Sequence, residues 1–531
     1  MISRVIRNRP SCLLHLCRSN NNAIWMQRNT TFSCRQFSFS TTTTAATTTS
    51  SSQSAHKDEY DVTIVGGGVV GIVLARNLSR IVPSNTRILL LERGNDPTTQ
   101  TATTTTTGSD GGIPNARSYA ISPFAWKHVL GNDLLLQNKQ KICPYQQMQI
   151  WESTGPATLL FDTHDIPNNQ PNGGTPIDYL GAMVEDSTLV SHLWNDCHTY
   201  NQTSNIITLH SNSNIQNITL NQHHHHPNDE GVTLQYTTNS NNHDENQDVM
   251  VVKTKVLIAA DGANSYVRNT LNMPIMSYGY GRKALTCTVK LDSHMPPIAF
   301  QRMEPNGPMA LLPTYNPNYA TIVWSTTPDI CHKYQQQQQQ QMLVQTLNQH
   351  LQTGPQIPRS NDAAAFVSQL TAGLTMKQWN DRQGFIVPPK INNIEGKVLS
   401  FDLKVQQATN YTLDQNNVFL MGDAAHTIHP MAGQGLNLGL NDVHSFITLY
   451  QQALESGMDI SSTHRIQYQH QRQMAVSAMQ LGIHTLHELY RVSPNSIVGN
   501  LNSLGMNLLN TATPLRSKLA QIATGIYDSI E

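Results

Sequence analysis

A glycine-rich turn near the start of the chain limits the possible folds more than any other stretch. Gly66, Gly68 and Gly71 lie between the short apolar run Asp61–Val65 and the helical pattern Val69–Ser79. A G-x-G-x-x-G sequence between a strand and a helix permits a tight turn, lets the backbone approach a pyrophosphate and allows the helix to pack closely on the strand. The start of the helix then faces the phosphates with its partial positive charge. The pattern predicts a dinucleotide site in a parallel β–α–β unit.

The next apolar run supports this interpretation. Arg87–Leu91 is typical of a second buried strand, and Glu92 follows it, about 20 residues after the last glycine of the motif. A carboxylate at this place can bind the ribose hydroxyls of a dinucleotide. The alternative is a structural turn with an exposed glutamate. The combination of the glycines with Glu92 favours the dinucleotide site.

Two strand ends farther along the chain carry acidic residues. Val256–Ala260 runs into an Asp-Gly pair that begins at Asp261, and Val418–Met421 runs into a Gly-Asp pair that ends at Asp423. These pairs resemble the D-G and G-D motifs of flavoprotein aromatic hydroxylases. In the second motif of those proteins, the aspartate binds the ribityl chain of the flavin. Three motifs in this order therefore predict that the dinucleotide is FAD.

The surroundings of Asp423 make the resemblance more specific. Residues 422–443, GDAAHTIHPMAGQGLNLGLNDV, are similar to the signature of the FAD-dependent monooxygenases of ubiquinone (coenzyme Q) biosynthesis. Three other stretches agree with this family, and with its mitochondrial ring-hydroxylating branch in particular: 116–122, 180–185 and 300–325. The likeness extends over residues 58–530.

The resemblance implies an α/β fold with a Rossmann-like FAD-binding domain of the aromatic hydroxylase (p-hydroxybenzoate hydroxylase-like) type, a mixed-sheet substrate domain and C-terminal helices. We expect a discontinuous FAD-binding domain at 58–150, 181–273 and 411–450, a substrate domain at 151–180 and 274–410, and a helical region at 451–531. The Asn/His-rich stretch at about 195–250 and the polyglutamine tract at 335–341 are interpreted as loop insertions, because lengthening a loop costs little. Two departures from the family, at 401–403 and 407–408, lie where the substrate is expected.

The implied activity is C5-type hydroxylation of the ring of a polyprenyl-4-hydroxybenzoate-type intermediate through a flavin hydroperoxide. Matching the family's motifs residue by residue gives these cofactor-binding candidates: Gly66, Gly68, Gly71, Glu92, Arg117, Asp261, Gly422, Asp423, Gly433, Gly435 and Asn437. The catalytic candidates are Pro430, which matches the family's proline beside the reactive flavin, and His429. A helix that begins near Gly435 is expected to direct its positive end toward the pyrimidine edge of the flavin.

Histidines beside the Gly-Asp motif allow two interpretations. His426 and His429 can act as an acid or base on a phenol, or they can hold the turn through hydrogen bonds. The structural interpretation is favoured for both. No third ligand accompanies this pair, and the run His223–His226 cannot direct four adjacent rings at one ion, so no metal site is predicted.

Three functional classes remain open. The first is the hydroxylase, for which the resemblance implies molecular oxygen as co-substrate and electrons from ferredoxin and ferredoxin reductase rather than NADPH. The second is a flavin-dependent isoprenoid (geranylgeranyl) reductase. The third is a flavin-bearing scaffold in a ubiquinone-synthesis protein complex. Apolar residues at helical spacing over Ile497–Ile526 are typical of internal packing, and alternatively of a peripheral membrane contact.

The first 57 residues differ in composition from the rest. They contain seven cations and no acid, since Asp58 is the first acidic residue, and they are rich in serine and threonine. This composition predicts a mitochondrial transit peptide and spacer, and with the family resemblance it indicates the matrix face of the inner membrane. The remaining chain is acidic in balance, which argues against nucleic-acid binding. No run of about 18 apolar residues is present.

Overall fold

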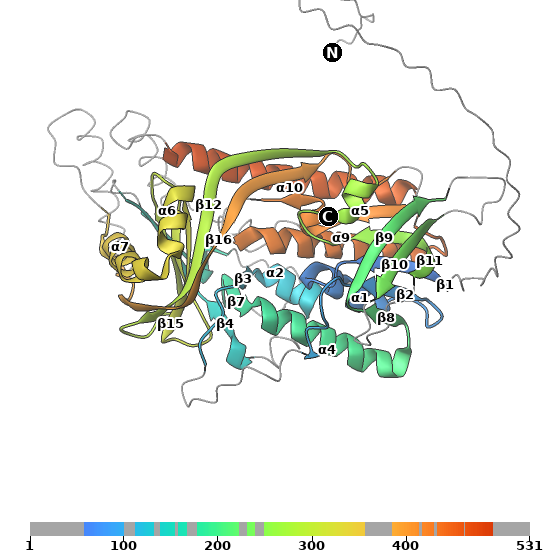
Figure 1. Ribbon diagram of the computed structural model, residues 1–531, viewed down its shortest axis with the longest axis horizontal. Helices are drawn as coiled ribbons and strands as arrows, with labels where there is room; N and C mark the ends of the chain where they lie inside the picture. Colours follow the sequence, from blue (N-terminus) through green and yellow to red (C-terminus); the bar gives the residue numbers. More distant parts are fainter. Residues whose placement is uncertain are drawn as a thin grey trace, which may run out of the picture. The chain divides into compact units, whose positions relative to one another are not determined.

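The computed structural model (Figure 1) describes residues 58–99, 112–131, 139–153, 158–166, 178–221, 231–238, 249–355, 385–413, 417–428, 433–460 and 462–491. Several predictions concern residues outside these ranges: the transit peptide, the run His223–His226, the catalytic candidates His429 and Pro430, and the segment Ile497–Ile526. In the part of the chain that is described, no helix is long and apolar enough to cross a membrane.

A seven-stranded sheet carries the dinucleotide motif. Its strands are β1 (Asp58–Val65), β2 (Ile88–Leu91), β8 (Ile207–His210), β9 (Ser213–Leu220), β10 (Val232–Thr238), β11 (Val249–Ala259) and β17 (Asn417–Leu420). The order is β8-β2-β1-β11-β10-β9, and β17 also pairs with β11. Because β8, β2, β1, β11 and β17 are parallel, their carboxyl ends meet at one edge. Gly66, Glu92, Asp261 and Gly422 follow these strand ends directly or within two residues, as predicted from the sequence.

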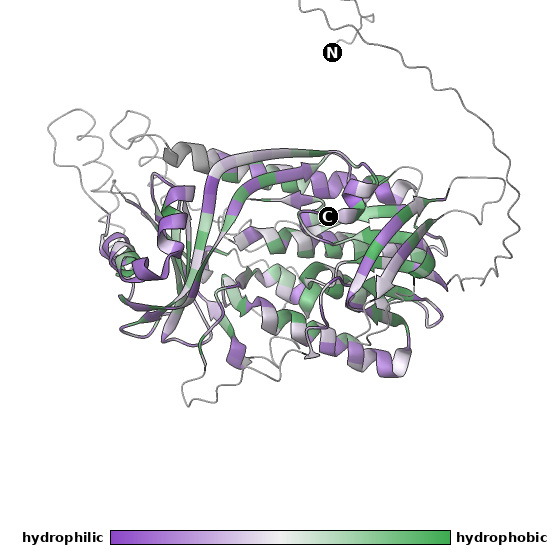
Figure 2. Ribbon diagram, viewed as in Figure 1, coloured by the Kyte–Doolittle hydropathy of each residue, from purple (hydrophilic) through white to green (hydrophobic). Residues whose placement is uncertain are grey.

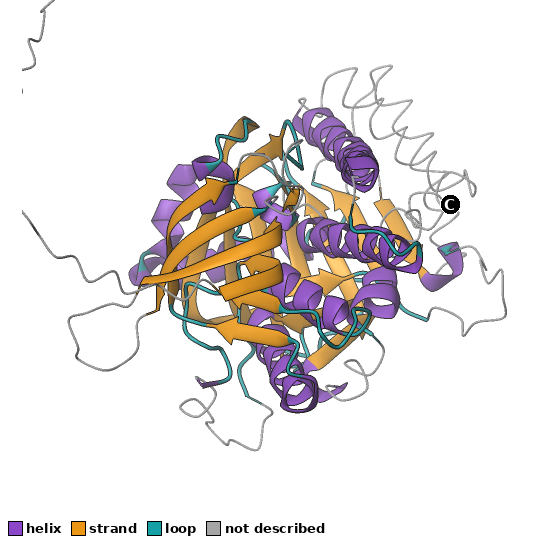
Figure 3. Cartoon of the chain, turned by 90° about the vertical axis from the view of Figure 1, so that its right-hand side faces the viewer, coloured by secondary structure: helices purple, strands orange, loops and turns teal. Residues whose placement is uncertain are grey.

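The helices next to this sheet are α1 (Val69–Ser79), α4 (Asp186–Ser204), α9 (Gln434–Glu455) and α10 (Ser462–Arg491). Helix α1 packs against both α4 and α9, and α10 packs against α9. Figure 2 shows hydrophobic and hydrophilic residues mixed along α4, which buries Leu189, Leu193 and Trp194. In Figure 3, helices lie on two sides of the strands.

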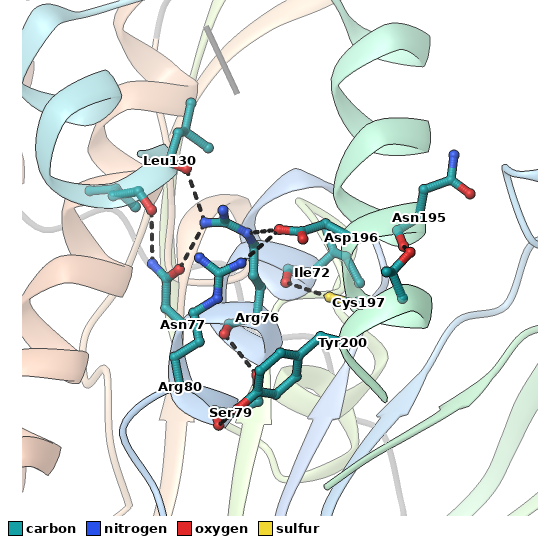
Figure 4. Close-up of polar contacts among 12 residues, drawn as sticks. Ile72, Arg76, Asn77, Ser79, Arg80, Leu130, Asn195, Asp196, Cys197 and Tyr200 are labelled. Carbon is teal, nitrogen blue, oxygen red and sulfur yellow. Dashed lines mark hydrogen bonds and ion pairs between the residues drawn. The ribbon is translucent and has the colours of Figure 1, made fainter. Parts of the chain in front are cut away.

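A buried arginine joins α1 to α4 (Figure 4). The Arg76 guanidinium pairs with Asp196 of α4 and donates to the carbonyl oxygen of Leu130 at 3.0 Å. Arg80, one turn farther along α1, pairs with the same carboxylate at 2.9 Å. The Tyr200 hydroxyl donates to the Ser79 carbonyl at 3.1 Å. These contacts fix the helix whose first turn forms the dinucleotide site.

An eight-stranded sheet forms the second layer. In spatial order its strands are β18 (His426–Thr427), β16 (Ile391–Ala408), β12 (Ile275–Leu291), β15 (Tyr319–Thr326), β14 (Met309–Pro313), β13 (Ile298–Met303), β5 (Gln147–Glu152) and β6 (Thr158–Asp162). All neighbours are antiparallel except β13 and β5, so the sheet is mixed as predicted. This sheet reaches past the domain boundaries that we expected at 151 and 410, since β5 begins at Gln147 and β18 lies beyond β17.

The remaining elements complete the two layers. Helices α6 (Pro328–Gln335) and α7 (Gln340–Gln352) pack on β12 and β16 and bury Leu343, Leu347 and Leu351 against this sheet. A small sheet consists of β3 (Ser118–Ile121), β7 (Gly181–Glu185) and β4 (Ile142–Tyr145), in this spatial order. Along the sequence, its strands lie between segments that form the two large sheets.

The two predicted loop insertions were largely wrong. Most of 195–250 forms the second half of α4 and the strands β8, β9 and β10, and only 222–230 and 239–248 lie outside the described residues. Asparagines instead serve the turns between these elements, since Asn205 and Asn212 both have φ of 52°, a conformation that asparagine tolerates. The polyglutamine tract contributes the last residue of α6 and the first residues of α7, because glutamine has good helix propensity.

Candidate active site

A cavity of about 1170 Å³ lies between the turns that follow strands of the seven-stranded sheet and the eight-stranded sheet. One side is formed by the strand-end turns and helix starts: Gly68, Val70, Gly422, Asp423, Gly433 and Gly435. The opposite side is formed by one face of the eight-stranded sheet: Met148, Ile150, Ala299, Gln301, Ala310, Val323 and Leu399. The lining is largely apolar, as expected for a small-molecule site with a few orienting polar groups.

The three motif glycines have different roles. A Cβ atom on Gly66, whose φ is 105°, would lie 2.4 Å from the carbonyl oxygen of Ala260, and one on Gly71 would lie 1.9 Å from that of Gly66. These two positions are closed by the packing of β1, α1 and the end of β11. A Cβ on Gly68 would meet nothing within 4 Å, and Gly68 lines the cavity. The second glycine therefore leaves its backbone open to a ligand, as a pyrophosphate requires.

Glu92 holds the glycine turn. Its two carboxylate oxygens accept from the backbone N–H groups of Gly67 at 2.5 Å and Gly94 at 2.6 Å. The indole N–H of Trp194 donates to the carbonyl oxygen of Gly67 at 2.9 Å, so α4 supports the same turn. Each carboxylate oxygen retains a lone pair for a further donor. This geometry is compatible with ribose binding by Glu92, which stays a prediction.

Asp423 faces the cavity from the short 3-10 turn η7 (Gly422–Ala424) that follows β17. Among the described residues its carboxylate has no hydrogen-bond partner. Burial by the surrounding protein raises the pKa of Asp423, while attraction from His426, Arg117 and Lys404 opposes this shift. An exposed acceptor that is open to the cavity is suited to a chain of hydroxyl groups, such as the ribityl chain of a flavin.

A buried charged network lies beneath this turn. Asp442 of α9 accepts from the backbone N–H of Gly422 at 2.8 Å and from Nε of Arg472 at 2.8 Å. Nε2 of His426 lies 2.7 Å from the same carboxylate, and the His426 side chain is only 1% exposed. Burial alone would raise the pKa of Asp442, but His426 and Arg472 hold it below its ordinary value. His426 therefore supports the turn and does not line the cavity, in agreement with the structural interpretation.

Glycines allow α9 to begin at the cavity wall. Gly433 precedes the helix with φ of 65°, and Gly433 and Gly435 line the cavity. A Cβ on Gly439 would lie 2.9 Å from Val70 and 3.2 Å from the Cα atom of Gly422, so the helix crosses η7 and α1 in close contact. The positive end of α9 thus lies at the wall of the cavity that Asp423 also lines, where it is available to an electron-rich edge of a ligand.

Two candidates point elsewhere. The side chain of Asn437 accepts from the Ser122 N–H at 2.9 Å and donates to the Ala120 carbonyl at 2.9 Å, which ties α9 to β3. The Asp261 carboxylate accepts from the backbone N–H of Tyr266 at 2.7 Å at the start of α5 (Tyr266–Thr270). Neither residue lines the cavity. A sequence motif locates such a residue at a strand or helix end, but it does not give the direction of its side chain.

Arg117 lines the cavity from just before β3. Its guanidinium lies 3.4 Å from the Asp186 carboxylate, which also accepts from the Tyr119 hydroxyl at 2.8 Å. The Arg117 side chain is 68% exposed, so it is accessible to a bound molecule. No group of three histidine, cysteine, aspartate or glutamate residues within the described ranges is arranged to hold a metal ion.

Comparisons with known proteins agree with this site. Residues 390–480 match the FAD binding domain family, and residues 64–125 match the NAD(P)-binding Rossmann-like domain family. The mitochondrial ubiquinone biosynthesis monooxygenase COQ6 of Drosophila melanogaster is 29% identical over 485 residues, which cover 89% of this chain and 91% of that protein. The Dictyostelium discoideum protein of the same name is 26% identical over 486 residues, or 88% of this chain and 91% of that protein. The chain is an FAD-dependent aromatic monooxygenase, and it is similar over most of its length to these ubiquinone biosynthesis monooxygenases.

Comparison with solved structures shows the fold of this monooxygenase. The p-nitrophenol 4-monooxygenase PnpA of Pseudomonas putida has a TM-score of 0.58 at 15% identity, over 89% of this chain and 98% of that one. The probable FAD-dependent monooxygenase PqsL of Pseudomonas aeruginosa has a TM-score of 0.56 at 15% identity, over 85% and 99%. The fold is that of the FAD-binding aromatic hydroxylases, as the sequence motifs predicted.

The monooxygenase uses FAD, and the residues present fit this cofactor. The open backbone at Gly68, the cavity-facing carboxylate of Asp423 and the start of α9 at Gly435 lie around one cavity and suit a pyrophosphate, a ribityl chain and a flavin ring, respectively. Sequence reasoning missed the counter-charges beneath them. Asp442 is an acid inside an otherwise apolar helix face, which was an available signal, whereas Arg472 has no local sequence feature that marks it.

Proposed function

We propose that this protein hydroxylates the aromatic ring of a polyprenyl-4-hydroxybenzoate-type intermediate of ubiquinone biosynthesis in mitochondria, by a C5-type hydroxylation. The observation that carries the proposal is the continuity of one cavity between the Gly68–Asp423 wall and the apolar face of the eight-stranded sheet. A phenol on this face would share the cavity with a flavin held at the other wall. The Dictyostelium discoideum and Drosophila melanogaster relatives are named as mitochondrial ubiquinone biosynthesis monooxygenases.

Bound and reduced FAD supplies the activation of molecular oxygen, from which one oxygen atom enters the ring and the other leaves as water. The protein holds the reactants and excludes water. Gly68, Asp423 and the start of α9 hold the cofactor, with Glu92 as a further candidate. The apolar side chains of β13, β14 and β15 shield the reacting atoms from solvent, which would otherwise divert an activated oxygen species. His429 and Pro430 are proposed to lie at this reaction site and are outside the described residues.

The proposal also covers the electron donor of the enzyme and its location in the cell. We infer that electrons come from ferredoxin and ferredoxin reductase, as the resemblance to the mitochondrial members of the family implies. A polyprenylated substrate resides in a bilayer, so the enzyme is proposed to work as a peripheral protein on the matrix face of the inner membrane, within a ubiquinone-synthesis protein complex. The basic, acid-free residues 1–57 are consistent with import into mitochondria.

The test uses purified enzyme loaded with FAD and a short-tailed prenyl-4-hydroxybenzoate under isotopically labelled oxygen. We expect a hydroxylated product that contains the label, with faster flavin reduction by reduced ferredoxin than by NADPH. A product without label would exclude hydroxylation, and saturation of the isoprenoid tail would establish the reductase class instead. A folded but flavin-free Asp423→Ala variant that still supported ubiquinone synthesis in cells would establish the scaffold class.

A further inference from the structure

The floor of the cavity is a cross-strand row of the eight-stranded sheet. Residues paired directly from strand to strand all line the cavity: Leu399, Thr286, Val323, Ala310, Gln301 and Ile150. Side chains at paired positions lie on the same face of a sheet, so these residues form one continuous surface. The surface is apolar except at Thr286 and Gln301.

Gln301 is the polar residue of this row whose side-chain amide has no strong hydrogen-bond partner among the described residues. The Thr286 hydroxyl donates to the carbonyl oxygen of Ala116 at 3.4 Å. The Gln301 side chain is buried, at 6% exposure, and its amide nitrogen contacts the sulfur of Met303 at 3.4 Å. A thioether is a weak acceptor, and no other hydrogen bond of this amide is made to a described residue. An amide that is buried without strong partners costs free energy.

A second buried glutamine shows the contrast. Gln149 lies on the neighbouring strand β5, in the alternate register, so its side chain points to the opposite face from Ile150 and Gln301. Its amide nitrogen donates to the Ile386 carbonyl at 2.9 Å, and its oxygen accepts from the Ile386 N–H at 3.0 Å. Gln149 thus forms hydrogen bonds with both backbone groups of Ile386. Gln301 has no such segment to satisfy among the described residues and faces the cavity.

Small residues leave room above Gln301. Ala310 is its direct partner on β14, and Ala299 is the preceding residue on the same face of β13. Both line the cavity. One methyl group lies beside the amide along β13 and the other beside it on β14, so together they leave a low surface on which a planar ring can lie with one polar substituent directed at the amide.

We propose that Gln301 recognises the substrate ring by hydrogen bonding its phenolic hydroxyl, and that Ala299 and Ala310 form the surface on which the ring lies. This inference rests on the proposed function, since it assigns the substrate of the same site to the phenol class. The amide oxygen accepts from the neutral phenol, and the amide N–H₂ donates to the phenolate once its proton has left. Gln301 is a specificity-determining residue that touches the substrate, and it transfers no proton itself.

The test measures binding to the FAD-loaded full chain by the change in flavin absorbance. The two probes are a short-tailed 3-prenyl-4-hydroxybenzoate and its 4-methoxy ether, which cannot donate a hydrogen bond. We expect the wild type to prefer the phenol about tenfold, as one well-made hydrogen bond implies. Gln301→Met, which has nearly the same shape, is expected to lose this preference, to bind the ether as the wild type does and to retain its FAD.

Gln149→Met is the matched control. It is expected to lower the midpoint of thermal unfolding, because the Ile386 backbone groups lose their partners, and to keep the preference for the phenol. If Gln301→Met folds and still prefers the phenol, the role of Gln301 is excluded. If Gln301→Met does not fold, Gln301→Leu is measured in the same way and decides between the same outcomes. A wild type that binds neither probe and forms no labelled product contradicts the proposed function itself.

Discussion

The two walls of the cavity are built in different ways. The flavin wall consists of turns at strand ends, with backbone N–H groups and carboxylates held by a buried charged network around Asp442. The substrate wall consists of regular β-structure, and its central cross-strand row is apolar apart from Gln301 and Thr286. A charged, hydroxyl-rich cofactor needs fixed donors and acceptors, whereas an apolar ring and tail need a surface of the right shape. Substitutions at the two walls should therefore have separable effects, on flavin retention and on substrate discrimination.

The largest difference in effect is expected between substitutions of two glycines in the same motif, one affecting folding and the other FAD retention. A Cβ on Gly71 would lie 1.9 Å from the Gly66 carbonyl, so Gly71→Ala should prevent close packing of α1 on β1 and destabilise the protein by several kcal/mol or abolish its folding. Gly68→Ala has free space on the protein side and should fold with a nearly unchanged unfolding midpoint, yet lose FAD. Thermal unfolding and the flavin-to-protein ratio measure both. Equal unfolding midpoints for the two variants would contradict the division of roles.

The second-largest loss of stability is expected when a buried counter-charge is removed. In Asp442→Asn, His426 and Arg472 lose the carboxylate between them, and an unbalanced buried charge costs about 3–5 kcal/mol. The pKa of Asp442 is lower in the folded state, so its contribution to stability is present above the ordinary pKa of an aspartate and is lost as the pH falls through the folded value.

Urea unfolding at several pH values measures this contribution. The wild type should lose free energy of unfolding on acidification below about pH 4 more steeply than Asp442→Asn does. Glu455→Gln, at the far end of α9, is the control and should match the wild type. Parallel pH profiles for Asp442→Asn and the wild type would show that the network contributes no stability.

The smallest effect on stability is expected for substitution of Asp423, which should stabilise the flavin-free protein instead of destabilising it. Folding raises the pKa of this carboxyl, so above that pKa its ionised form weakens the folded state. Asp423→Asn should therefore raise the thermal midpoint of the flavin-free protein slightly while FAD retention falls. Gln301→Met, on the other wall, should leave FAD retention unchanged. A loss of FAD in Gln301→Met, or full retention in Asp423→Asn, would remove the distinction between the walls.

Sequence reasoning was most successful where backbone geometry dictates the residue type. The turn at Gly66–Gly71, the helix Val69–Ser79 and the strand before Gly422 were all predicted, because tight turns and close helix packing restrict these positions to glycine. It failed where the outcome depends on tertiary contacts. The side chains of Asp261 and Asn437 bind backbone groups rather than facing the cavity, and their direction depends on elements far away in the sequence.

The substrate wall was the least predictable part. Alternation in β13 indicates which residues share a face, but it does not show which face is covered by α7 and which borders the cavity. Gln149 and Gln301 look alike in the sequence, and only the strand register separates the structural glutamine from the one that faces the cavity. The Asn-rich and Gln-rich stretches were misjudged because their composition resembles that of loops, although β9, β10 and α7 are regular elements.

The pairing of Arg472 with Asp442 makes α10 part of the flavin site, although the three short FAD motifs, at Gly66–Gly71, Asp261 and Asp423, all lie before α10 begins. A premature stop codon or frameshift between residues 456 and 471 would leave all of these motifs intact in the translated chain. Its product would lack the counter-charge that holds the Gly422 turn, so an allele of this kind should be null for flavin binding even though its coding sequence still contains the complete FAD signature.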